Sequence, residues 1–312
     1  MSPRIAVVIP CFNEGVTIAA VVAGFRAALP QAVIYVYDNN SSDQTASLAM
    51  AAGAVVQREV RQGKGHVVRR AFADVDADVY VLVDGDGTYD APAAPGMVAL
   101  LLEQQLDMVN GARRDQVEAA YRPGHRFGNA MLTYLVGTVF GRDITDMLSG
   151  YRVFSRRFVK SFPALSAGFE TETEFTVHAL ELGMPIAEVL TDYAERPAGS
   201  ASKLRTIRDG IRILRTILVL VKDERPLAFF GAAATVLLLL GLGFGTSVAL
   251  EFTRTGLVPR LPTAVLASTL VLLSALAIAC GFVLDSVARG RKEFKRLAYL
   301  SVPSLARFST AL

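Results

Sequence analysis

Tryptophan is absent from this 312-residue sequence, and cysteine and histidine are scarce, with two and three residues. Cys11 and Cys280 lie far apart in unlike surroundings, so we expect both to be reduced, without a disulfide framework. The histidines are dispersed along the chain and form no constellation typical of a metal site: His66, His125 and His178. We therefore expect no catalytic role for any histidine.

Two common nucleotide-binding motifs are also missing. No GxxxxGK is followed by Ser or Thr, and Gly63-Lys64-Gly65 does not substitute for that pattern. No GxGxxG follows the first apolar segment of the chain. These absences exclude a P-loop protein and the usual dinucleotide-binding fingerprint.

Charge is unevenly distributed, although the formal net charge is only +3. Residues 1–195 carry 16 Lys or Arg and 23 Asp or Glu, a net charge of −7. Residues 196–225 and 289–312 each carry a net charge of +5. A nucleic-acid-binding protein needs its basic surface on the folded domain, so this distribution argues against a nucleic-acid partner.

Two long segments contain no charged residue: Pro226 to Leu250, with 25 residues, and Leu261 to Leu284, with 24. A membrane-spanning helix needs about 20 apolar residues, so we predict two transmembrane helices, at 226–250 and 261–285. The alternative is a pair of buried core helices, but helices of globular proteins rarely run this long without charge. Neither segment is N-terminal, as a signal peptide would be.

The segments that flank the predicted spans are basic. Lys222 and Arg225 precede the first span, and five Lys or Arg lie between 289 and 296 after the second. The positive-inside rule places both flanks in the cytoplasm. We therefore predict a multi-pass protein of the inner (cytoplasmic) membrane, with a short external loop at 251–260 and both termini in the cytoplasm.

A basic amphipathic stretch precedes the first span. Between Ser202 and Val221, apolar residues recur at spacings of three and four, and arginines occupy other positions. This pattern indicates helices that lie on a membrane surface, or a helix packed on a globular domain. We divide the chain into a cytosolic domain (1–195), a juxtamembrane segment (196–225), a transmembrane hairpin (226–288) and a basic cytosolic tail (289–312).

The first domain alternates between short apolar runs and helical patterns. The runs are predicted strands: Ile5–Ile9, Val33–Tyr37, Ala54–Gln57, Val79–Val83 and Met108–Asn110. The stretches between them are predicted helices: Gly15–Leu29, Asp43–Ala52, Lys64–Ala73 and Ala93–Gln104. Such alternation is typical of a buried, mostly parallel sheet. We predict a Rossmann-like α/β fold with helices on both faces of the sheet.

Polar residues follow three of the predicted strands: Asn13-Glu14, Asp38-Asn39-Asn40 and Asp84-Gly85-Asp86. Ligands of parallel sheets bind beyond the carboxyl ends of the strands, so we expect these clusters to form a site. Asp38 could accept N–H groups of a nucleotide base or help to cap a helix, and Glu14 could face a nucleotide or cap the following helix.

Asp84-Gly85-Asp86 is the strongest indication of a functional site in the sequence. Two carboxylates two residues apart, in a turn that Gly85 permits, can converge on one cation, and Mg²⁺ or Mn²⁺ prefers such oxygen ligands. A plain Asp-Gly turn is the alternative. An EF-hand loop is excluded, because its sixth and twelfth positions would be Tyr89 and Pro95 instead of Gly and Glu.

Together these segments resemble the family 2 glycosyltransferases of GT-A fold. The resemblance rests on Pro10-Cys11-Phe12-Asn13-Glu14, Asp38 with its polar tail, Gly63-Lys64-Gly65 and Asp84-Gly85-Asp86, in this order. Later segments are similar to those of dolichyl- and polyprenyl-phosphate hexosyltransferases: Asn110-Gly111-Ala112-Arg113, Arg126 with Gly128-Asn129, Asp146 with Ser149-Gly150-Tyr151-Arg152, and Arg196 with Ser202-Lys203-Leu204. Two C-terminal spans after a basic stretch resemble the bacterial two-helix members.

The resemblance implies a role for each matched residue. The base and ribose of a nucleotide sugar would be lined by Pro10, Phe12, Glu14, Val36 and Asp38. The same donor would also contact Lys64, Gly85, Arg196 and Lys203. Asp84 and Asp86 would hold Mg²⁺ or Mn²⁺ and form the catalytic set with Arg113. The acceptor phosphate would bind to Arg113, Arg126, Asn129 and Ser202, in keeping with the affinity of arginine for phosphate.

The implied function is an inverting, metal-dependent hexosyltransferase. It would move a hexose from a nucleotide-diphosphate sugar, of the UDP-glucose or GDP-mannose type, to a polyprenyl monophosphate at the cytoplasmic membrane face. That acceptor is already anionic, so we expect no obligatory general base. Asp146 and the run Glu170, Glu172 and Glu174 are candidates for supporting roles, although the glutamates could equally form a solvated helix start.

Other functions stay open. The acceptor could be another membrane lipid or a glycan, although the absence of tryptophan excludes the QxxRW motif of processive synthases. A non-catalytic, membrane-anchored nucleotide-sugar-binding protein is a third reading, against which the presence of both Asp84 and Asp86 argues. Thr88 and Asn39 depart from the family pattern, so a metal contact of Thr88 and the choice of base stay open. The resemblance also implies a homo-oligomer, in which glycines of the first span could pack against a neighbour: Gly241, Gly243 and Gly245.

Overall fold

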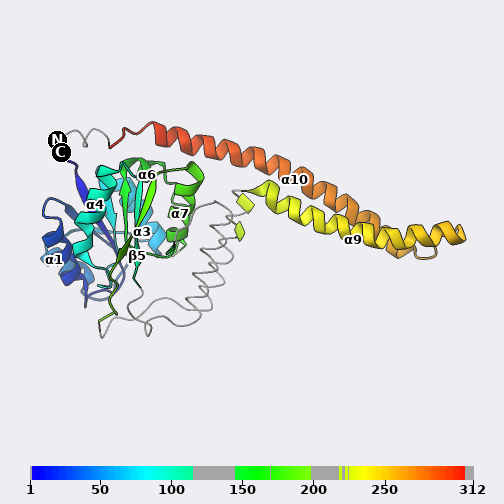
Figure 1. The fold of residues 1–312 in the computed structure, drawn as a ribbon. Helices are drawn as coiled ribbons and strands as arrows, with labels where there is room; N and C mark the ends of the chain where they lie inside the picture. The colour runs from blue at the N-terminus through cyan, green and yellow to red at the C-terminus, as the bar shows by residue number, and fades with distance from the viewer. Residues whose placement is uncertain are drawn as a thin grey trace. The chain divides into compact units, whose positions relative to one another are not determined.

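The structure is a computed structural model that describes residues 2–114, 145–168, 170–197, 218–219, 222–223 and 225–305. These residues belong to two compact units (Figure 1). The first unit contains the described residues up to 197 together with those from Lys295 onward. The second unit contains the described residues between 218 and Phe294.

A seven-stranded sheet with the order β3-β2-β1-β4-β6-β5-β7 forms the centre of the first unit. Its strands are β1 (Ile5–Cys11), β2 (Val33–Asp38), β3 (Val55–Arg58), β4 (Val79–Leu82), β5 (Met108–Arg113), β6 (Arg152–Ser155) and β7 (Ile186–Thr191). All neighbouring strands are parallel except β6, which is antiparallel to β4 and β5. The predicted α/β fold with a mostly parallel sheet is confirmed.

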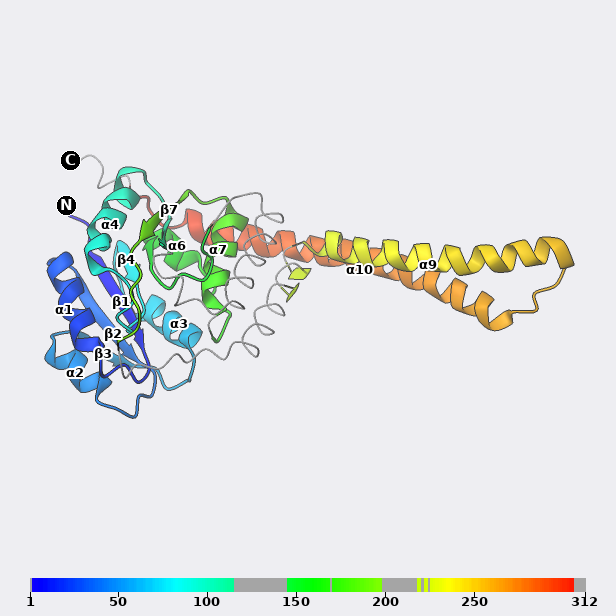
Figure 2. The same cartoon turned by 60° about the horizontal axis from the view of Figure 1, so that its bottom comes forward.

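Helices cover both faces of this sheet (Figure 2). The helical elements of the first unit are α1 (Ile18–Ala28), α2 (Thr45–Ala51), α3 (Lys64–Asp74), η1 (Ala91–Ala93), α4 (Ala94–Glu103), α6 (Arg156–Ser161) and α7 (Thr171–Leu182). Residues of α1, α2 and α4 pack in one core cluster, and residues of α3, α6 and α7 pack in a second. The two clusters are the first core cluster and the second core cluster below.

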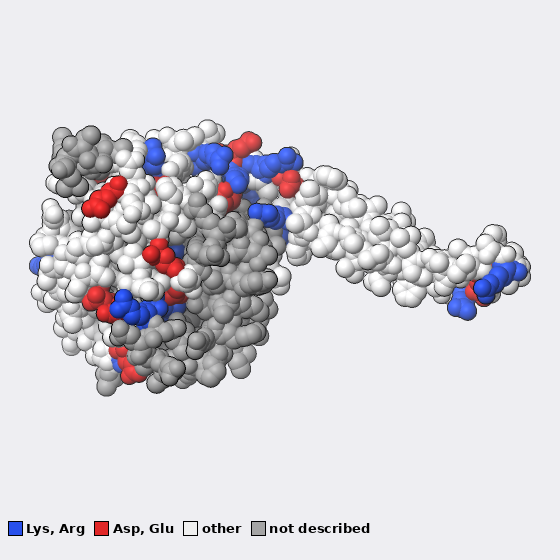
Figure 3. All heavy atoms as spheres, in the orientation of Figure 1, with Lys and Arg blue, Asp and Glu red and all other residues white. Residues whose placement is uncertain are grey.

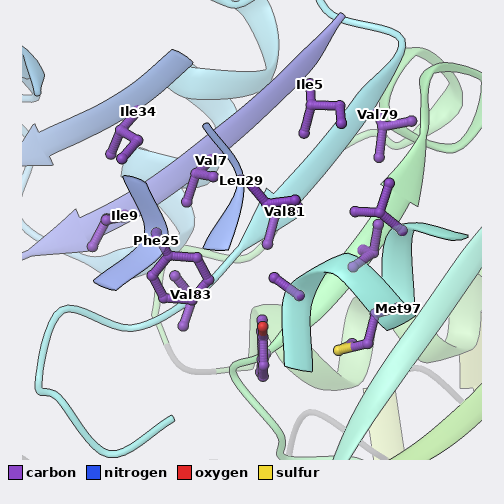
Figure 4. Packing of buried hydrophobic residues seen from close by; sticks show 14 of the residues in the cluster. Ile5, Val7, Ile9, Phe25, Leu29, Ile34, Val79, Val81, Val83 and Met97 are labelled. Carbon is purple, nitrogen blue, oxygen red and sulfur yellow. The ribbon is translucent and has the colours of Figure 1, made fainter. Parts of the chain in front are cut away.

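The alternation of side chains along the buried strands divides the core between the two faces. In β1, Val7 and Ile9 belong to the first core cluster (Figure 4), whereas Ala6 and Val8 belong to the second. Successive side chains of a strand point to opposite faces, so a strand covered on both faces is apolar throughout. This explains the continuous apolar runs of the sequence.

The second unit consists mainly of α9 (Pro226–Thr255) and α10 (Leu261–Leu300), whose last residues belong to the first unit. Both helices are long and apolar enough to cross a membrane. They lie side by side: Ser274 Oγ donates to the carbonyl of Ala234 at 2.8 Å. On the face shown in Figure 3, the middle of the pair carries no charged group, and charged groups lie near the connecting loop. Most of the predicted amphipathic segment 196–225 lies outside the described residues.

Residues 295–305, which belong to the first unit, contact its helices and its core. Lys295 Nζ lies 2.6 Å from Glu181 Oε2 on α7, and Arg157 Nε donates to the carbonyl of Val302 at 2.7 Å. Leu305 is buried in the first core cluster. The described residues from Lys295 to Leu305 are therefore part of the folded α/β unit.

Candidate active site

The acidic pair Asp84 and Asp86 begins just after β4, between β1 and β6 in the sheet. The turn needs a glycine, because a Cβ at Gly85 would lie 2.6 Å from Cys11 Sγ. Thr17 Oγ1 donates to the carbonyl of Gly85 at 2.7 Å, which ties the turn to the residues preceding α1. A short apolar strand followed by this tight turn thus presents two carboxylates at the edge of the sheet.

Lys64 lies between two carboxylates from distant parts of the chain. Its Nζ is 2.5 Å from Asp84 Oδ1 and 2.5 Å from Glu172 Oε1, and its side chain is only 7% exposed. Burial alone would lower the pKa of Lys64, but the two carboxylates outweigh burial and raise the pKa above its ordinary value. Lys64 therefore stays a cation at the acidic pair.

The glycine before Lys64 has a structural reason. Gly63 has φ of +136°, and a Cβ there would lie 2.2 Å from the carbonyl oxygen of Ala167. The start of α3 can therefore approach the backbone near residue 167 closely. This approach brings Lys64 near the start of α7, where Glu172 is located.

Asp86 binds the second cation of the site. Arg196 Nη2 lies 2.6 Å from Asp86 Oδ2, and the Asp86 side chain is only 5% exposed. Arg196 is brought there by the chain after β7: Ala194 N donates to the carbonyl of Thr88 at 2.8 Å. The hydroxyl of Thr88 donates to Asp86 Oδ1 at 2.7 Å, so Thr88 supports the carboxylate in this structure.

Arg113, at the end of β5, is held by Asp146. Its Nε and Nη2 lie 2.7 and 2.8 Å from the two carboxylate oxygens of Asp146, a bidentate pair. Burial would raise the pKa of Asp146, but the hydrogen bonds and charge of Arg113 hold it below its ordinary value. The Arg113 guanidinium also lies 5.5 Å from the centre of the Tyr193 ring. These contacts orient Arg113 on the strand-end side of the sheet.

The predicted nucleotide-binding residues of β1 and β2 lie beside one another. Cys11 is the register partner of Asp38, and Pro10 that of Tyr37. Asp38 is buried, and its carboxylate accepts the Ser41 N–H at 3.3 Å. The Val36 side chain, in contrast, is fully buried in the first core cluster. Contact of Val36 with a base is therefore not supported by its position and stays a prediction.

The remaining predicted donor residues, Phe12 and Glu14, follow β1. Glu14 is buried, and its N–H donates to Thr45 Oγ1 at 2.8 Å. Its Cγ lies 3.6 Å from where a Cβ on Gly85 would be, so the Glu14 side chain borders the acidic turn. Phe12 is partly exposed. The strand-end clusters expected from the sequence are therefore neighbours in space.

Asn39 has a structural role that sequence reasoning missed. Its Nδ2 donates to the carbonyls of Glu59 and Arg61 at 2.9 and 2.7 Å, and its Oδ1 accepts the N–H of Gly63 at 2.7 Å. The side chain thus fastens the segment that leads to Lys64. An aspartate could not donate the first two of these hydrogen bonds, which explains an amide at this position.

The role of Glu172 at the site was also left open by the sequence. Glu172 and Glu174 at the start of α7 are buried, so the alternative of a solvated helix start is wrong. Glu174 accepts the backbone N–H groups of Leu165 and Ser166, whereas Glu172 pairs with Lys64. The only sequence signal was the acidic run itself, since Lys64 and Glu172 are 108 residues apart.

The structure therefore brings together Asp84, Asp86, Lys64 and Arg196, with Glu14 beside the acidic turn. Arg113 and Asp146 form a separate pair, linked to the acidic turn through aromatic contacts of Tyr193 with Tyr89. Four residues predicted to bind the donor or acceptor lie outside the described residues: Arg126, Asn129, Ser202 and Lys203. No group of three or more His, Cys, Asp or Glu that could hold a metal occurs within the described part of the chain.

A mostly parallel α/β sheet with acidic and basic side chains at its carboxyl edge is typical of an enzyme that binds phosphorylated ligands. Residues 6–162 match the family described as glycosyl transferase family 2. The chain is 34% identical over 249 residues to glycosyltransferase AglJ of Haloferax volcanii, covering 80% of this chain and 82% of that protein. The chain thus belongs to glycosyltransferase family 2.

Two further similarities extend this comparison. The undecaprenyl-phosphate mannosyltransferase of Micrococcus luteus is 25% identical over 220 residues, covering 64% of this chain and 86% of that protein. A crystal structure of glucosyl-3-phosphoglycerate synthase from Mycobacterium tuberculosis, in complex with Mn²⁺, UDP and glucosyl-3-phosphoglycerate, is 25% identical. That similarity has a TM-score of 0.55 and covers 70% of this chain and 80% of the other. The expected GT-A fold is confirmed.

Proposed function

We propose that this chain is an inverting hexosyltransferase that moves a hexose from a nucleotide-diphosphate sugar, of the UDP-glucose or GDP-mannose type, to a polyprenyl monophosphate. The carrying observation is that a strand-end acidic pair bound by Lys64 and Arg196 occurs in a chain with two helices apolar enough to cross a membrane. The relative named undecaprenyl-phosphate mannosyltransferase supports the lipid acceptor. The similar structure with bound UDP and Mn²⁺ supports the donor class and the metal.

The acidic pair fits a hard divalent cation. Asp84 and Asp86 offer carboxylate oxygens, which Mg²⁺ and Mn²⁺ prefer, and the Asp84 side chain is 28% exposed and therefore accessible. No third acidic or imidazole ligand joins them among the described residues. Oxygens of the donor diphosphate would therefore complete the coordination. Bound there, Mg²⁺ or Mn²⁺ would stabilise the charge that develops on the leaving diphosphate.

Lys64 and Arg196 would bind the donor diphosphate, since each already stands at one carboxylate of the pair. Lysine supplies a point charge and arginine a planar fork, and both suit phosphate oxygens. The base and ribose would then lie toward the ends of β1 and β2, beside Phe12, Glu14 and Asp38. The same placement leaves the hexose near Lys64 and Glu172.

In the transfer step, an oxygen of the acceptor phosphate forms a bond to the anomeric carbon of the hexose. The bond from that carbon to the donor diphosphate breaks, and its electron pair leaves with the nucleoside diphosphate. The acceptor phosphate is already an anion, so no proton has to be removed from the nucleophile. Arg113, held by Asp146, would orient the acceptor phosphate for attack opposite the leaving group, which inverts the anomeric centre.

The two apolar helices would place this chemistry at a membrane surface. Basic residues flank both predicted spans, so we propose that the α/β unit and both termini lie in the cytoplasm, at the inner membrane. A polyprenyl phosphate presents its charged head at that surface. We propose that α9 and α10 anchor the enzyme in the membrane. We also propose that several copies of the chain associate.

The test uses detergent-purified full-length protein, undecaprenyl phosphate and Mg²⁺ or Mn²⁺. Radiolabelled UDP-glucose, UDP-galactose, UDP-N-acetylglucosamine and GDP-mannose are offered separately, and label is counted in the organic phase. We expect label from one donor, and loss of that label with EDTA. If the folded protein transfers no label from any donor to the organic phase, the lipid-phosphate acceptor is wrong. Label in a water-soluble glycan would then identify the acceptor class.

A further inference from the structure

Both carboxylates of the acidic pair are already bound to cations that belong to the chain. Lys64 binds Asp84 at 2.5 Å and Arg196 binds Asp86 at 2.6 Å. The side chains of Lys64 and Asp86 are 7% and 5% exposed, so water screens these ion pairs weakly. A divalent cation that approaches Asp84 and Asp86 therefore has to compete with an ammonium and a guanidinium group.

We propose that Lys64 and Arg196 make metal binding and donor binding depend on one another. Each basic side chain occupies a carboxylate until the donor diphosphate attracts it, and the carboxylates then become available to the metal. This inference rests on the proposed donor class and adds the order in which the charges exchange partners. Because binding couplings are reciprocal, the metal must strengthen diphosphate binding by the same factor.

Glu172 explains how Lys64 can change partners inside a buried site. A buried ammonium group that loses its only carboxylate would be left as an uncompensated charge, which is strongly unfavourable. Glu172 Oε1 lies 2.5 Å from the Lys64 Nζ, as close as Asp84. Lys64 therefore keeps one carboxylate partner when a metal takes Asp84. The other oxygen of Glu172, Oε2, is buried and has no hydrogen-bond partner within the described residues.

Arg196 differs from Lys64 in a way that fits the same exchange. Its side chain is 28% exposed, against 7% for Lys64. A guanidinium group with this exposure can exchange Asp86 for a phosphate oxygen or for water. Lys64 thus occupies Asp84 as a buried cation, and Arg196 occupies Asp86 as a partly exposed cation.

The number of protein ligands points in the same direction. Mg²⁺ prefers octahedral coordination by oxygen, and no group of three or more His, Cys, Asp or Glu that could hold a metal occurs among the described residues. Two carboxylates that must first release their own cations make a weak metal site. Diphosphate oxygens would both supply missing ligands and draw Lys64 and Arg196 away.

The test measures Mn²⁺ binding, not activity. Free Mn²⁺ is followed by electron paramagnetic resonance in detergent-purified full-length protein, alone and with saturating UDP or GDP, with protein-free blanks for the nucleotide. We expect the wild-type protein to bind Mn²⁺ at least ten-fold more tightly with one nucleotide. We expect Lys64→Met and Arg196→Gln to bind Mn²⁺ alone at least ten-fold more tightly than the wild type, with a smaller gain from nucleotide.

Lys160→Met is the matched control, because Lys160 binds backbone carbonyls, including that of Phe72 at 2.8 Å, and no carboxylate among the described residues. Its Mn²⁺ affinity should equal that of the wild type. If both site variants bind Mn²⁺ alone no more tightly than the wild type, the exchange is wrong; should Lys64→Met fail to fold, Arg196→Gln alone decides. Equal wild-type Mn²⁺ affinity with and without a nucleotide that does bind also overturns the exchange and leaves the proposed function intact. Absence of UDP and GDP binding in the presence of Mn²⁺ would instead contradict the proposed donor class.

Discussion

The hydroxyl of Tyr299 donates a 2.8 Å hydrogen bond to Oδ2 of Asp107, a residue 192 positions earlier in the chain. Asp107 is buried just before β5, and its Oδ1 accepts the hydroxyl of Ser155 at 2.6 Å. Arg157 stacks over the Tyr299 ring, with 5.2 Å between the guanidinium carbon and the ring centre. The last residues of α10 thus satisfy a buried carboxylate of the sheet.

Tyr299→Phe should therefore destabilise the α/β unit by about 1–2 kcal/mol, because Asp107 loses one hydrogen-bond donor to a buried charge. Chemical unfolding followed by circular dichroism in detergent measures the difference. Tyr35→Phe is the control, since the hydroxyl of Tyr35 makes no hydrogen bond within the described residues. Equal stability of Tyr299→Phe and the control would show that the contact contributes nothing.

Asn39→Asp should destabilise the protein, although the two side chains have nearly the same size and shape. The new carboxylate would face the carbonyls of Glu59 and Arg61 without a proton to donate, at a cost of about 2 kcal/mol or more. The segment before Lys64 would loosen, so UDP or GDP binding should weaken as well. Asn40→Asp is the control, because Asn40 is more exposed and donates to a single backbone carbonyl, that of Val60. Calorimetry and chemical unfolding of the two variants would separate the effects, and identical behaviour would refute the role of Asn39.

Asp84→Asn and Asp86→Asn should lower hexose transfer on the order of 100-fold or more, because each removes a carboxylate that would hold the metal, and the metal would stabilise the charge on the leaving diphosphate. Both variants should remain folded, since asparagine preserves the shape of each side chain. Asp76→Asn is the control; Asp76 forms exposed ion pairs with Arg4 and Arg156. Transfer by either site variant at the wild-type rate would contradict the metal assignment.

The acid sensitivity of the fold should depend on His178. Burial, with a smaller effect from the charge of Lys295, lowers the pKa of His178 from 6.5 to about 3. The unfolded chain therefore binds a proton below pH 6.5 that the folded chain does not, and stability falls as the pH drops. The expected loss is about 2 kcal/mol between pH 7 and pH 5.

His178→Gln should remove most of that pH dependence, while His66→Gln, at a more exposed position, should leave it unchanged. Unfolding free energies of the three proteins at pH 7, 6 and 5 provide the measurement. An unchanged slope in His178→Gln would assign the acid sensitivity to other groups.

Sequence patterns predicted the regular part of the α/β unit well. The runs at Ile5–Ile9 and Val33–Tyr37 are the strands β1 and β2, because strands covered on both faces are apolar throughout. The helix predicted at Lys64–Ala73 is α3. In contrast, β6 and β7 were not predicted. β6 is only four residues long and begins with the fully buried Arg152, and β7 is largely half-exposed, so neither has a strong apolar pattern.

The site was predicted less completely, for a physical reason. Asp84 and Asp86 follow a strong strand signal, and their position at the sheet edge follows from the fold. The partners Lys64, Glu172 and Arg196 reach them through tertiary packing between segments far apart in the chain. No local pattern encodes such a meeting, which is why Glu172 could not be distinguished from a solvated glutamate.

The reversed direction of β6 determines where the connection between β5 and β6 meets the sheet. β5 ends at Arg113 and the antiparallel β6 begins at Arg152, so the chain leaves and re-enters the sheet at one edge, that of the acidic pair. Both ends are anchored there: Arg114 N donates to the carbonyl of Thr191, and Thr145 N to Glu188. The strand pairings of the described sheet therefore involve residues up to Arg113 on one side of this connection and from Arg152 on the other. A chimera joined at Arg114 and Thr145 would therefore keep every strand pairing of the described sheet, because no paired residue of that sheet lies between the two joints.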